Sequence, residues 1–310
     1  MTISINTTKV LKALLPLIII LHHVSFRTDI NGLVLFSNVG VTVVTIFFFL
    51  SGYGLFQSLN DKKDYLKKFL KNRLSTLLIP YLISIILYQS FCICVEDTFP
   101  LITISSFLNG NTNSILPASW YVIVISIFYF MFWVNFNNKR TLEFQYLTFF
   151  ITGGVIIIIL KLINFPSYWY ISLGGLYAGM FHSIIGKHIQ KQNNEKLYMV
   201  IIALTTLTFY FIPSTFACIL FYASLSTFVV LLSELLHLGN LIKVRAIRIL
   251  SNISYELYLT HVIVYRALRC DLLYIQSDCI YIIFTFIITI IFSYIIMNIS
   301  KKAKELWILK

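Results

Sequence analysis

Lys12 and His23, near the start of the chain, have a spacing that would place a cation and a base on one face of a helix. Ten residues separate them, and His22 is the only polar one. At about 100° per residue, the two side chains lie on one helical stripe about 16 Å apart. Pro16 lies near this stripe and removes the hydrogen bond that the Lys12 carbonyl would have accepted. We predict a helix face with a cation and a base, turned toward protein or a water-filled cavity.

A second interruption occurs in the next apolar run, where Ser51, Gly52 and Gly54 form a patch of small residues. Such small residues let another helix or a ligand approach the backbone closely. The pattern alone is compatible with helix packing and with a binding cavity.

The basic segment from Asp61 to Arg73 leads into Pro80 and Tyr81. One interpretation is an interfacial helix that lies on anionic lipid headgroups. The other is a cationic wall for a phosphorylated cytosolic cofactor, with Arg73 the best-placed contact because it is nearest the following apolar run. The sequence leaves both interpretations open.

A late apolar segment contains Ser254, Tyr258 and His261, which fall on one helix side at spacings of four and three. An ionisable group inside a membrane span is a candidate functional residue. His261 can equally be a histidine that is hydrogen-bonded between helices.

The composition defines the elements that must position these residues. Of the 310 residues, 58% are hydrophobic and only 12% are charged, and the mean hydropathy is +0.85. Apolar runs of about 20 residues, the length that spans a bilayer as a helix, recur along the chain, without the alternation of barrel strands. We predict an all-α integral membrane protein, organised as a single transmembrane domain over residues 1–310.

Ten membrane spans are predicted, with both termini cytoplasmic. This arrangement leaves only Arg27, Lys161, Arg266 and Arg269 of the 24 Lys and Arg residues on the outside, as the positive-inside rule requires. The predicted spans are about 10–27, 36–58, 75–95, 119–136, 145–163, 168–186, 197–212, 215–236, 249–267 and 279–299. The segment from about 96 to 119 is predicted to be an outer loop.

The net charge of +12 does not predict nucleic-acid binding, because the cations are spread over short loops. The five cysteines lack metal-ligand spacing, and we expect no metal. Cys270 and Cys279 flank a predicted outer loop and are either two free thiols or a disulfide. The N-terminus lacks a small-residue cleavage site, so we expect an uncleaved first span.

In chain order, these segments resemble the acyltransferase 3 family of multispan enzymes that O-acylate bacterial surface carbohydrates. The similarity covers nearly the whole chain. The family's basic residue, ten residues and His correspond to Lys12 and His23, with Lys where Arg is usual. Its other elements match Phe48-Phe49-Leu50-Ser51-Gly52-Tyr53, the basic run from Lys67 to Tyr81, and Ile253-Ser254-Tyr255-Glu256-Leu257-Tyr258-Leu259-Thr260-His261. The chain departs from the family where many members have a pair of acidic residues and this sequence has Ile125 and Ser126.

The resemblance implies a membrane O-acyltransferase, most simply an acetyltransferase of the bacterial cytoplasmic membrane. Acetyl-CoA would be the donor, and a surface glycan or its lipid-linked oligosaccharide precursor the acceptor. A transporter or flippase for a lipid-linked sugar is the alternative. We expect His23 to act as the base and Lys12 and Arg73 to bind CoA. His22 would either pack against His23 or orient it. Ser51, Gly52 and Tyr53 would shape the cavity, and Tyr258 and His261 would support the site.

Overall fold

A computed structural model of the chain describes residues 2–62, 64–95, 110–138 and 140–308. These residues form helices joined by turns, and one isolated bridge between Arg269 and Tyr274 is the only β pairing in the part described. The all-α prediction is therefore confirmed. Most of the predicted outer loop at 96–119 lies outside the described residues.

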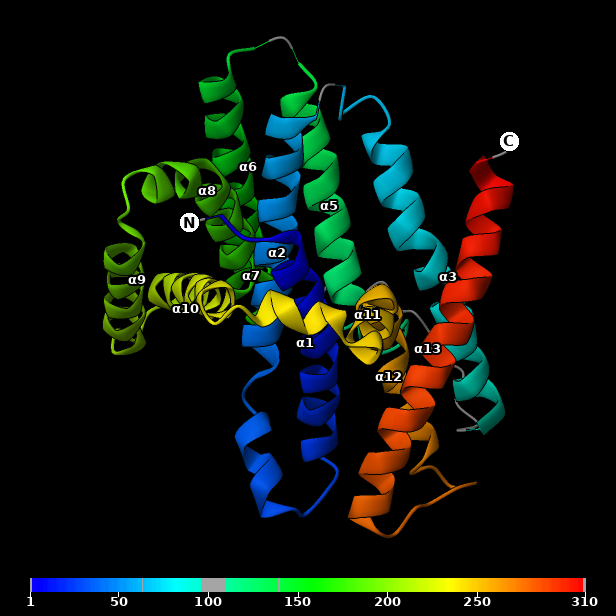
Figure 1. Ribbon diagram of the computed structural model, residues 1–310. Helices are drawn as coiled ribbons and strands as arrows, with labels where there is room; N and C mark the ends of the chain where they lie inside the picture. The colour runs from blue at the N-terminus through cyan, green and yellow to red at the C-terminus, as the bar shows by residue number, and fades with distance from the viewer. Residues whose placement is uncertain (1, 63, 96–109, 139, 309–310) are drawn as a thin grey trace. The chain divides into compact units, whose positions relative to one another are not determined.

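The helices follow one another in the order shown in Figure 1. They are α1 (Ile5–Ser25), η1 (Asn31–Phe36), α2 (Gly40–Asp61), α3 (Phe69–Val95), α5 (Ser119–Phe136), α6 (Leu142–Leu162), α7 (Tyr168–Ile171), α8 (Leu173–Lys191), α9 (Glu195–Tyr210), α10 (Thr215–Leu235), η2 (Leu238–Lys243), α11 (Arg245–Asn252), α12 (Ser254–Ala267) and α13 (Asp278–Ile308).

Seven of the described helices are long and apolar enough to cross a membrane, namely α1, α2, α3, α5, α6, α10 and α13. This supports an integral membrane protein. The other three predicted spans fall on α7 with α8, on α9, and on α11 with α12. The count of ten spans and the cytoplasmic placement of both termini stay predictions.

Several predicted boundaries are wrong. The segment 168–186 is divided between α7 and α8 at Ser172, and 249–267 is divided between α11 and α12 at Ile253. The basic segment after α2 is not one interfacial helix, because residues 64–68 form turns and Asp64 has a left-handed φ of 59°. Arg73 instead lies within α3.

The chain divides into two compact units. The first unit comprises Met1–Lys12, Gly40–Lys68 and Met131–Arg248, and the second comprises Ala13–Val39, Phe69–Phe130 and Ile249–Lys310. In the first unit, α2 packs against α8 and α10, and α9 packs on α10. In the second unit, α3, α12 and α13 pack on one another. The prediction of a single domain stays a prediction.

Backbone contact holds α2 and α8 together. A Cβ atom on Gly52 would lie 2.1 Å from the carbonyl oxygen of Leu176, and one on Gly179 would lie 2.1 Å from that of Phe49. Glycine is therefore required on both sides of this contact, because any larger residue would force the helices apart. Gly52 serves helix packing, which is one of the two interpretations of its motif.

The second unit joins α12 and α13 through buried hydroxyl groups. Thr260 Oγ1 and Ser293 Oγ lie 2.8 Å apart, and both side chains are fully buried. The Thr260 hydroxyl donates to the carbonyl of Glu256 in its own helix, so the single proton of Ser293 is the one that donates across the pair, although Ser293 Oγ also lies 2.6 Å from the carbonyl of Thr289. A polar pair of this kind is well suited to helix association in hydrocarbon, where no water competes for the hydrogen bond.

We predict that Gly179→Ala lowers the free energy of unfolding by about 1–3 kcal/mol, because its new methyl group meets backbone atoms. Gly54→Ala is the matched control, since a Cβ there meets nothing within 4 Å. The control should be unchanged or more stable, because alanine favours the helix. Thermal melting of the purified protein in detergent measures both variants, and equal melting temperatures would contradict close α2–α8 contact.

Candidate active site

α1 is one continuous helix from Ile5 to Ser25, with Pro16 inside it. Lys12 and His23 thus lie on the same helix, with about 1.5 Å of axial rise for each of the eleven steps between them, and their common stripe stays a prediction. The Lys12 side chain is exposed, whereas His23 is half-buried. Lys12 belongs to the first unit and His23 to the second, and each is described within its own unit.

His23 lies among the aromatic rings of α12. Its ring centroid is 5.0 Å from that of His261 and 5.7 Å from that of Tyr265, and the Tyr265 ring stacks on it at 17°. Both partners project from the same helix at a spacing of four residues, so one face of α12 supports the imidazole. The structure thus brings together two histidines that the sequence proposed separately.

His261 is buried to an unusual degree for an ionisable residue. Its side chain is 1% exposed, and neither ring nitrogen makes a well-formed hydrogen bond with a described residue. A buried polar group without a partner costs about 1–3 kcal/mol. The interpretation of His261 as a histidine hydrogen-bonded between helices stays a prediction, because the described residues show no such bond from another helix.

His22 is held by the short η1 helix. Its Nδ1 lies 2.9 Å from the carbonyl oxygen of Phe36, so the tautomer that makes this bond donates from Nδ1. The His22 and His23 rings meet edge to face, with centroids 4.9 Å apart. His22 thus contacts His23 from a position that is fixed by the backbone.

Tyr258 continues the α12 face toward α5. Its ring centroid is 6.0 Å from that of His261 and 5.3 Å from that of Tyr121. Tyr258 is buried, and its hydroxyl is 3.5 Å from the carbonyl oxygen of Ala118. The predicted common side of Tyr258 and His261 is confirmed by this geometry.

Two neighbours of His23 were not among the predicted site residues. They are Tyr265, which stacks on the imidazole, and Arg27, whose guanidinium carbon lies 4.8 Å from the centre of the Tyr265 ring. A cation over an aromatic face is attracted by the negative potential of the ring. Arg27 was an exception to the positive-inside rule, and that signal could have identified it.

A second exception, Arg269, connects the elements around this site. Its guanidinium forms an ion pair with Asp278, contacts the carbonyl of Arg27 and lies 4.1 Å from the centre of the Tyr281 ring. Asp278 also accepts a 2.9 Å hydrogen bond from the backbone N–H of Asp29. We call this group the arginine latch; it ties the chain after α1 to the start of α13.

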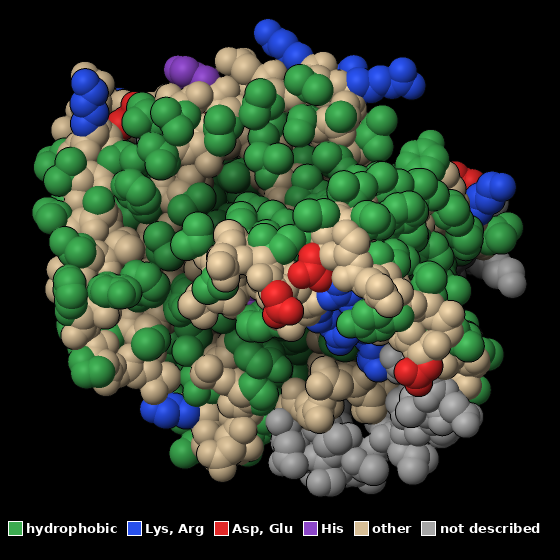
Figure 2. All heavy atoms as spheres, turned by 90° about the horizontal axis from the view of Figure 1, so that it is seen from below, with side chains coloured by type: hydrophobic (Ala, Val, Ile, Leu, Met, Phe, Trp, Pro, Cys, Tyr) green, Lys and Arg blue, Asp and Glu red, His purple; other side chains and the backbone are tan. Residues whose placement is uncertain are grey.

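The latch lies at the bottom end of the second unit in Figure 1, where α1 and α12 end and α13 begins. Figure 2 views the molecule from that side. Lys and Arg side chains there lie beside Asp and Glu side chains, within a surface that is otherwise largely hydrophobic. Opposite charges placed together in this way neutralise one another and lower the cost of charge near lipid.

Arg73 does not lie at the same end of the second unit as His23. The beginning of α3 is at the top of Figure 1, whereas α1 ends at the bottom. The half-buried Arg73 side chain lies 5.6 Å from the ring centre of Tyr129 and 5.9 Å from that of Phe69. The predicted phosphate-binding cation and the predicted base are therefore at opposite ends.

In the first unit, Gly52 and Tyr53 make packing contacts. The Tyr53 hydroxyl accepts a 3.1 Å hydrogen bond from the backbone N–H of Ile3, and its ring centroid is 5.8 Å from that of His182. Tyr53 is buried and Ser51 is half-buried. The role of Ser51, Gly52 and Tyr53 in shaping a substrate cavity stays a prediction.

Within the described ranges, no cluster of three or more His, Cys, Asp or Glu side chains is arranged to hold a metal ion. All five cysteines are free, including Cys270 and Cys279.

Comparison with known proteins identifies the family. The model of an acyltransferase domain matches residues 6–298, which include α1, α12 and nearly all of the helical core. No match was found among curated proteins or among solved structures. Because the matched range covers almost the entire chain and the helices are those of a membrane protein, the chain belongs to the acyltransferase 3 family and is a membrane acyltransferase.

Proposed function

We propose that this acyltransferase is an O-acetyltransferase of the bacterial cytoplasmic membrane. It would move an acetyl group from cytosolic acetyl-CoA to a hydroxyl of a surface polysaccharide or its lipid-linked precursor. The observation that supports this most directly is the His23–His261 pair, with ring centroids 5.0 Å apart on α1 and α12. Such a pair provides the base that a weakly nucleophilic alcohol requires.

In the proposed reaction, His23 accepts the proton of the acceptor hydroxyl as its oxygen attacks the thioester carbonyl. The new C–O bond forms, the C–S bond breaks, and the CoA thiolate recovers a proton from the imidazolium. General base catalysis of this kind contributes about 10²–10⁴-fold to the rate. Stacking on Tyr265 supports this role because it fixes the orientation of the imidazole ring.

His261 would act on the substrate directly. Its ring nitrogens make no well-formed hydrogen bond with described residues, so a hydroxyl or carbonyl group of a substrate is a suitable partner. Two positively charged imidazoles at this distance would repel each other, so one ring of the pair stays neutral and able to accept a proton.

The donor phosphates would interact with Lys12 and Arg73. Both are basic side chains of the kind that bind phosphates, and CoA is too polar to cross a bilayer unaided. About 16 Å separates Lys12 from His23 along α1, so the extended pantetheine arm would have to carry the thioester over this distance. The same intramembrane polar residues would also suit a transporter or flippase for a lipid-linked sugar.

We predict that His23→Ala lowers acetyl transfer by about 10²–10⁴-fold, because the acceptor loses its base. The measurement supplies radiolabelled acetyl-CoA to membranes that contain the protein and counts label in the glycan fraction. His188→Ala is the matched control, since His188 is exposed on α8, and it should label normally.

Two outcomes would contradict this proposal. Equal labelling by wild type and a normally inserted His23→Ala variant would exclude His23 as the base. Absence of labelling with wild-type membranes would favour transport or another acyl donor.

We also predict that His261→Phe separates activity from stability. Phenylalanine fills the buried site and removes two polar atoms from an apolar surrounding, so the melting temperature should stay equal or rise. Glycan labelling should nevertheless fall at least tenfold, because no nitrogen is left to meet the substrate. Normal labelling by the variant would show that His261 only packs.

A further inference from the structure

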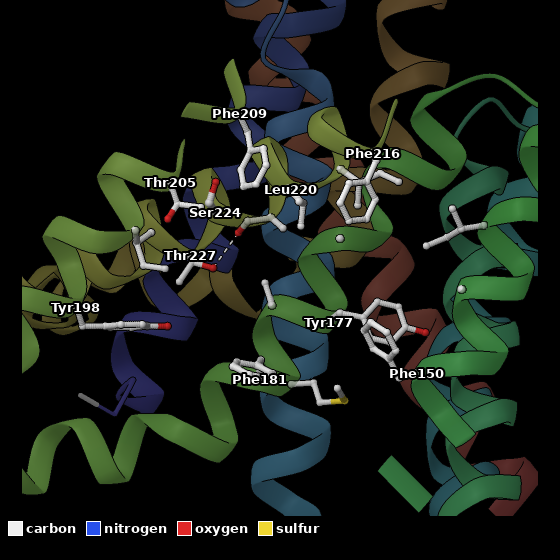
Figure 3. A pocket seen from close by; sticks show the side chains of 18 of the residues that line it. Phe150, Tyr177, Phe181, Tyr198, Thr205, Phe209, Phe216, Leu220, Ser224 and Thr227 are labelled. Atoms are coloured by element: carbon white, nitrogen blue, oxygen red, sulfur yellow. Dashed lines mark hydrogen bonds between the residues drawn. The ribbon is translucent and has the colours of Figure 1, made fainter. Parts of the chain in front are cut away.

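A large cavity in the first unit is separate from the residues assigned so far. It has a volume of about 690 Å³ and lies between α6, α8, α9 and α10. Six aromatic side chains dominate its walls: Phe150, Tyr177, Phe181, Tyr198, Phe209 and Phe216 (Figure 3). Volumes of about 300–1,000 Å³ are typical of ligand sites and far exceed the small voids of a packed core.

The few polar groups of the cavity wall are satisfied within the protein. Thr205, Ser224 and Thr227 each donate a hydrogen bond to a carbonyl of their own helix, at 2.7, 3.0 and 2.8 Å. Water needs two to four polar partners to occupy a cavity stably. The walls therefore favour a ligand that is a hydrocarbon.

The cavity opens sideways rather than being sealed by its walls. Phe150, Ile158 and Phe216 line it and are 60%, 58% and 70% exposed. They lie on α6 and α10, which are both long and apolar enough to cross a membrane. The opening is thus formed by exposed apolar side chains of two candidate membrane spans, which are suited to contact with lipid hydrocarbon.

One end of the cavity leads to a basic turn. In Figure 3, Phe181 and Tyr198 lie toward the bottom of the view and Phe209 and Phe216 toward the top. Beyond Phe181 and before Tyr198, the end of α8, the turn that follows it and the start of α9 form a segment, residues 187–196, which we call the lysine turn.

The lysine turn carries three exposed lysines, Lys187, Lys191 and Lys196. Two carboxylates are near them, those of Glu195 in the turn and of Asp61, whose Oδ1 is 3.3 Å from Lys187 Nζ. The excess of positive charge next to an apolar cavity complements a molecule that has one anionic end and one hydrocarbon end. Each basic residue near a bilayer surface adds about 1 kcal/mol of attraction to anionic lipid.

We propose that this cavity binds an anionic glycerophospholipid, with one acyl chain between α6, α8, α9 and α10 and the phosphate at the lysine turn. A bilayer phospholipid is the occupant with both required parts, and it is present wherever the protein is inserted. This site is independent of the proposed acetyl transfer.

Native mass spectrometry of the full-length protein, stripped of lipid in detergent, tests the proposal. The probes are dioleoyl phosphatidylglycerol and dioleoyl phosphatidylcholine, which share their acyl chains and differ in headgroup charge. We expect wild type to retain the anionic lipid at least tenfold better. Equal retention of the two lipids would overturn the proposal.

Gly154→Trp tests whether the chain enters the cavity. Gly154 lines the cavity, and a Cβ atom there meets nothing within 4 Å, so the indole can grow into the space without a clash. Phosphatidylglycerol retention should fall at least tenfold. Val155→Trp is the matched control, because Val155 is the next α6 residue, is 47% exposed and is not a lining residue, and it should retain the lipid normally.

Replacing both Lys191 and Lys196 by Gln should reduce retention of phosphatidylglycerol to that of phosphatidylcholine. The control, Lys301→Gln with Lys302→Gln at exposed positions of α13, removes the same charge elsewhere and should have no effect. Undisturbed retention in the lysine-turn variant would overturn the assigned headgroup position.

Two further measurements complete the test. If Gly154→Trp does not fold, a phosphatidylglycerol with a photoreactive group on its acyl chain should label peptides that contain Phe150, Phe181 or Phe216. Labelling confined to other peptides would contradict the site. Displacement of phosphatidylglycerol by equimolar undecaprenyl phosphate would also overturn it, because the preferred occupant would then be an isoprenoid.

Discussion

Every polar group inside a membrane helix must find its partner within the chain, because hydrocarbon offers none. The structure meets this constraint repeatedly with short local bonds. Hydroxyls such as that of Thr260 donate to the preceding turn, and His22 bonds to the carbonyl of Phe36 in η1. His261 is among the described residues that depart from the rule, as Ser126 and Ser183 also do, since it is buried and its nitrogens make no well-formed bond with described residues. Departures of this kind are expected where a substrate completes the polar contacts.

The helical fold could be predicted because hydropathy adds over a whole span and tolerates small local errors. The breaks at Ser172 and Ile253 could not, because a continuous apolar run looks the same whether its helix is straight or interrupted. The basic segment after Asp61 shows a related limit. Its charges are compatible with an amphipathic helix. Asp64, however, adopts a left-handed backbone conformation, which a continuous right-handed helix does not contain.

Periodicity predicted the site only within single helices. The shared face of Tyr258 and His261 follows from their spacing, and the stripe that contains His23 follows from that of α1. The meeting of α1 with α12 depends on tertiary packing between residues far apart in the chain, which spacing does not encode. Tyr265 and Arg27 were missed for this reason, although the unusual sidedness of Arg27 was visible in the charge pattern.

The arginine latch has a consequence for how the protein is made. Its bonds join Asp29 to Asp278, residues 249 positions apart, so the end of α1 is secured only after α13 has been made. Until α13 emerges, the end of α1 and its histidines lack these contacts, and the translocation machinery must hold an unfinished bundle in the bilayer. Synthesis that stops early would thus release fragments with an exposed imidazole helix.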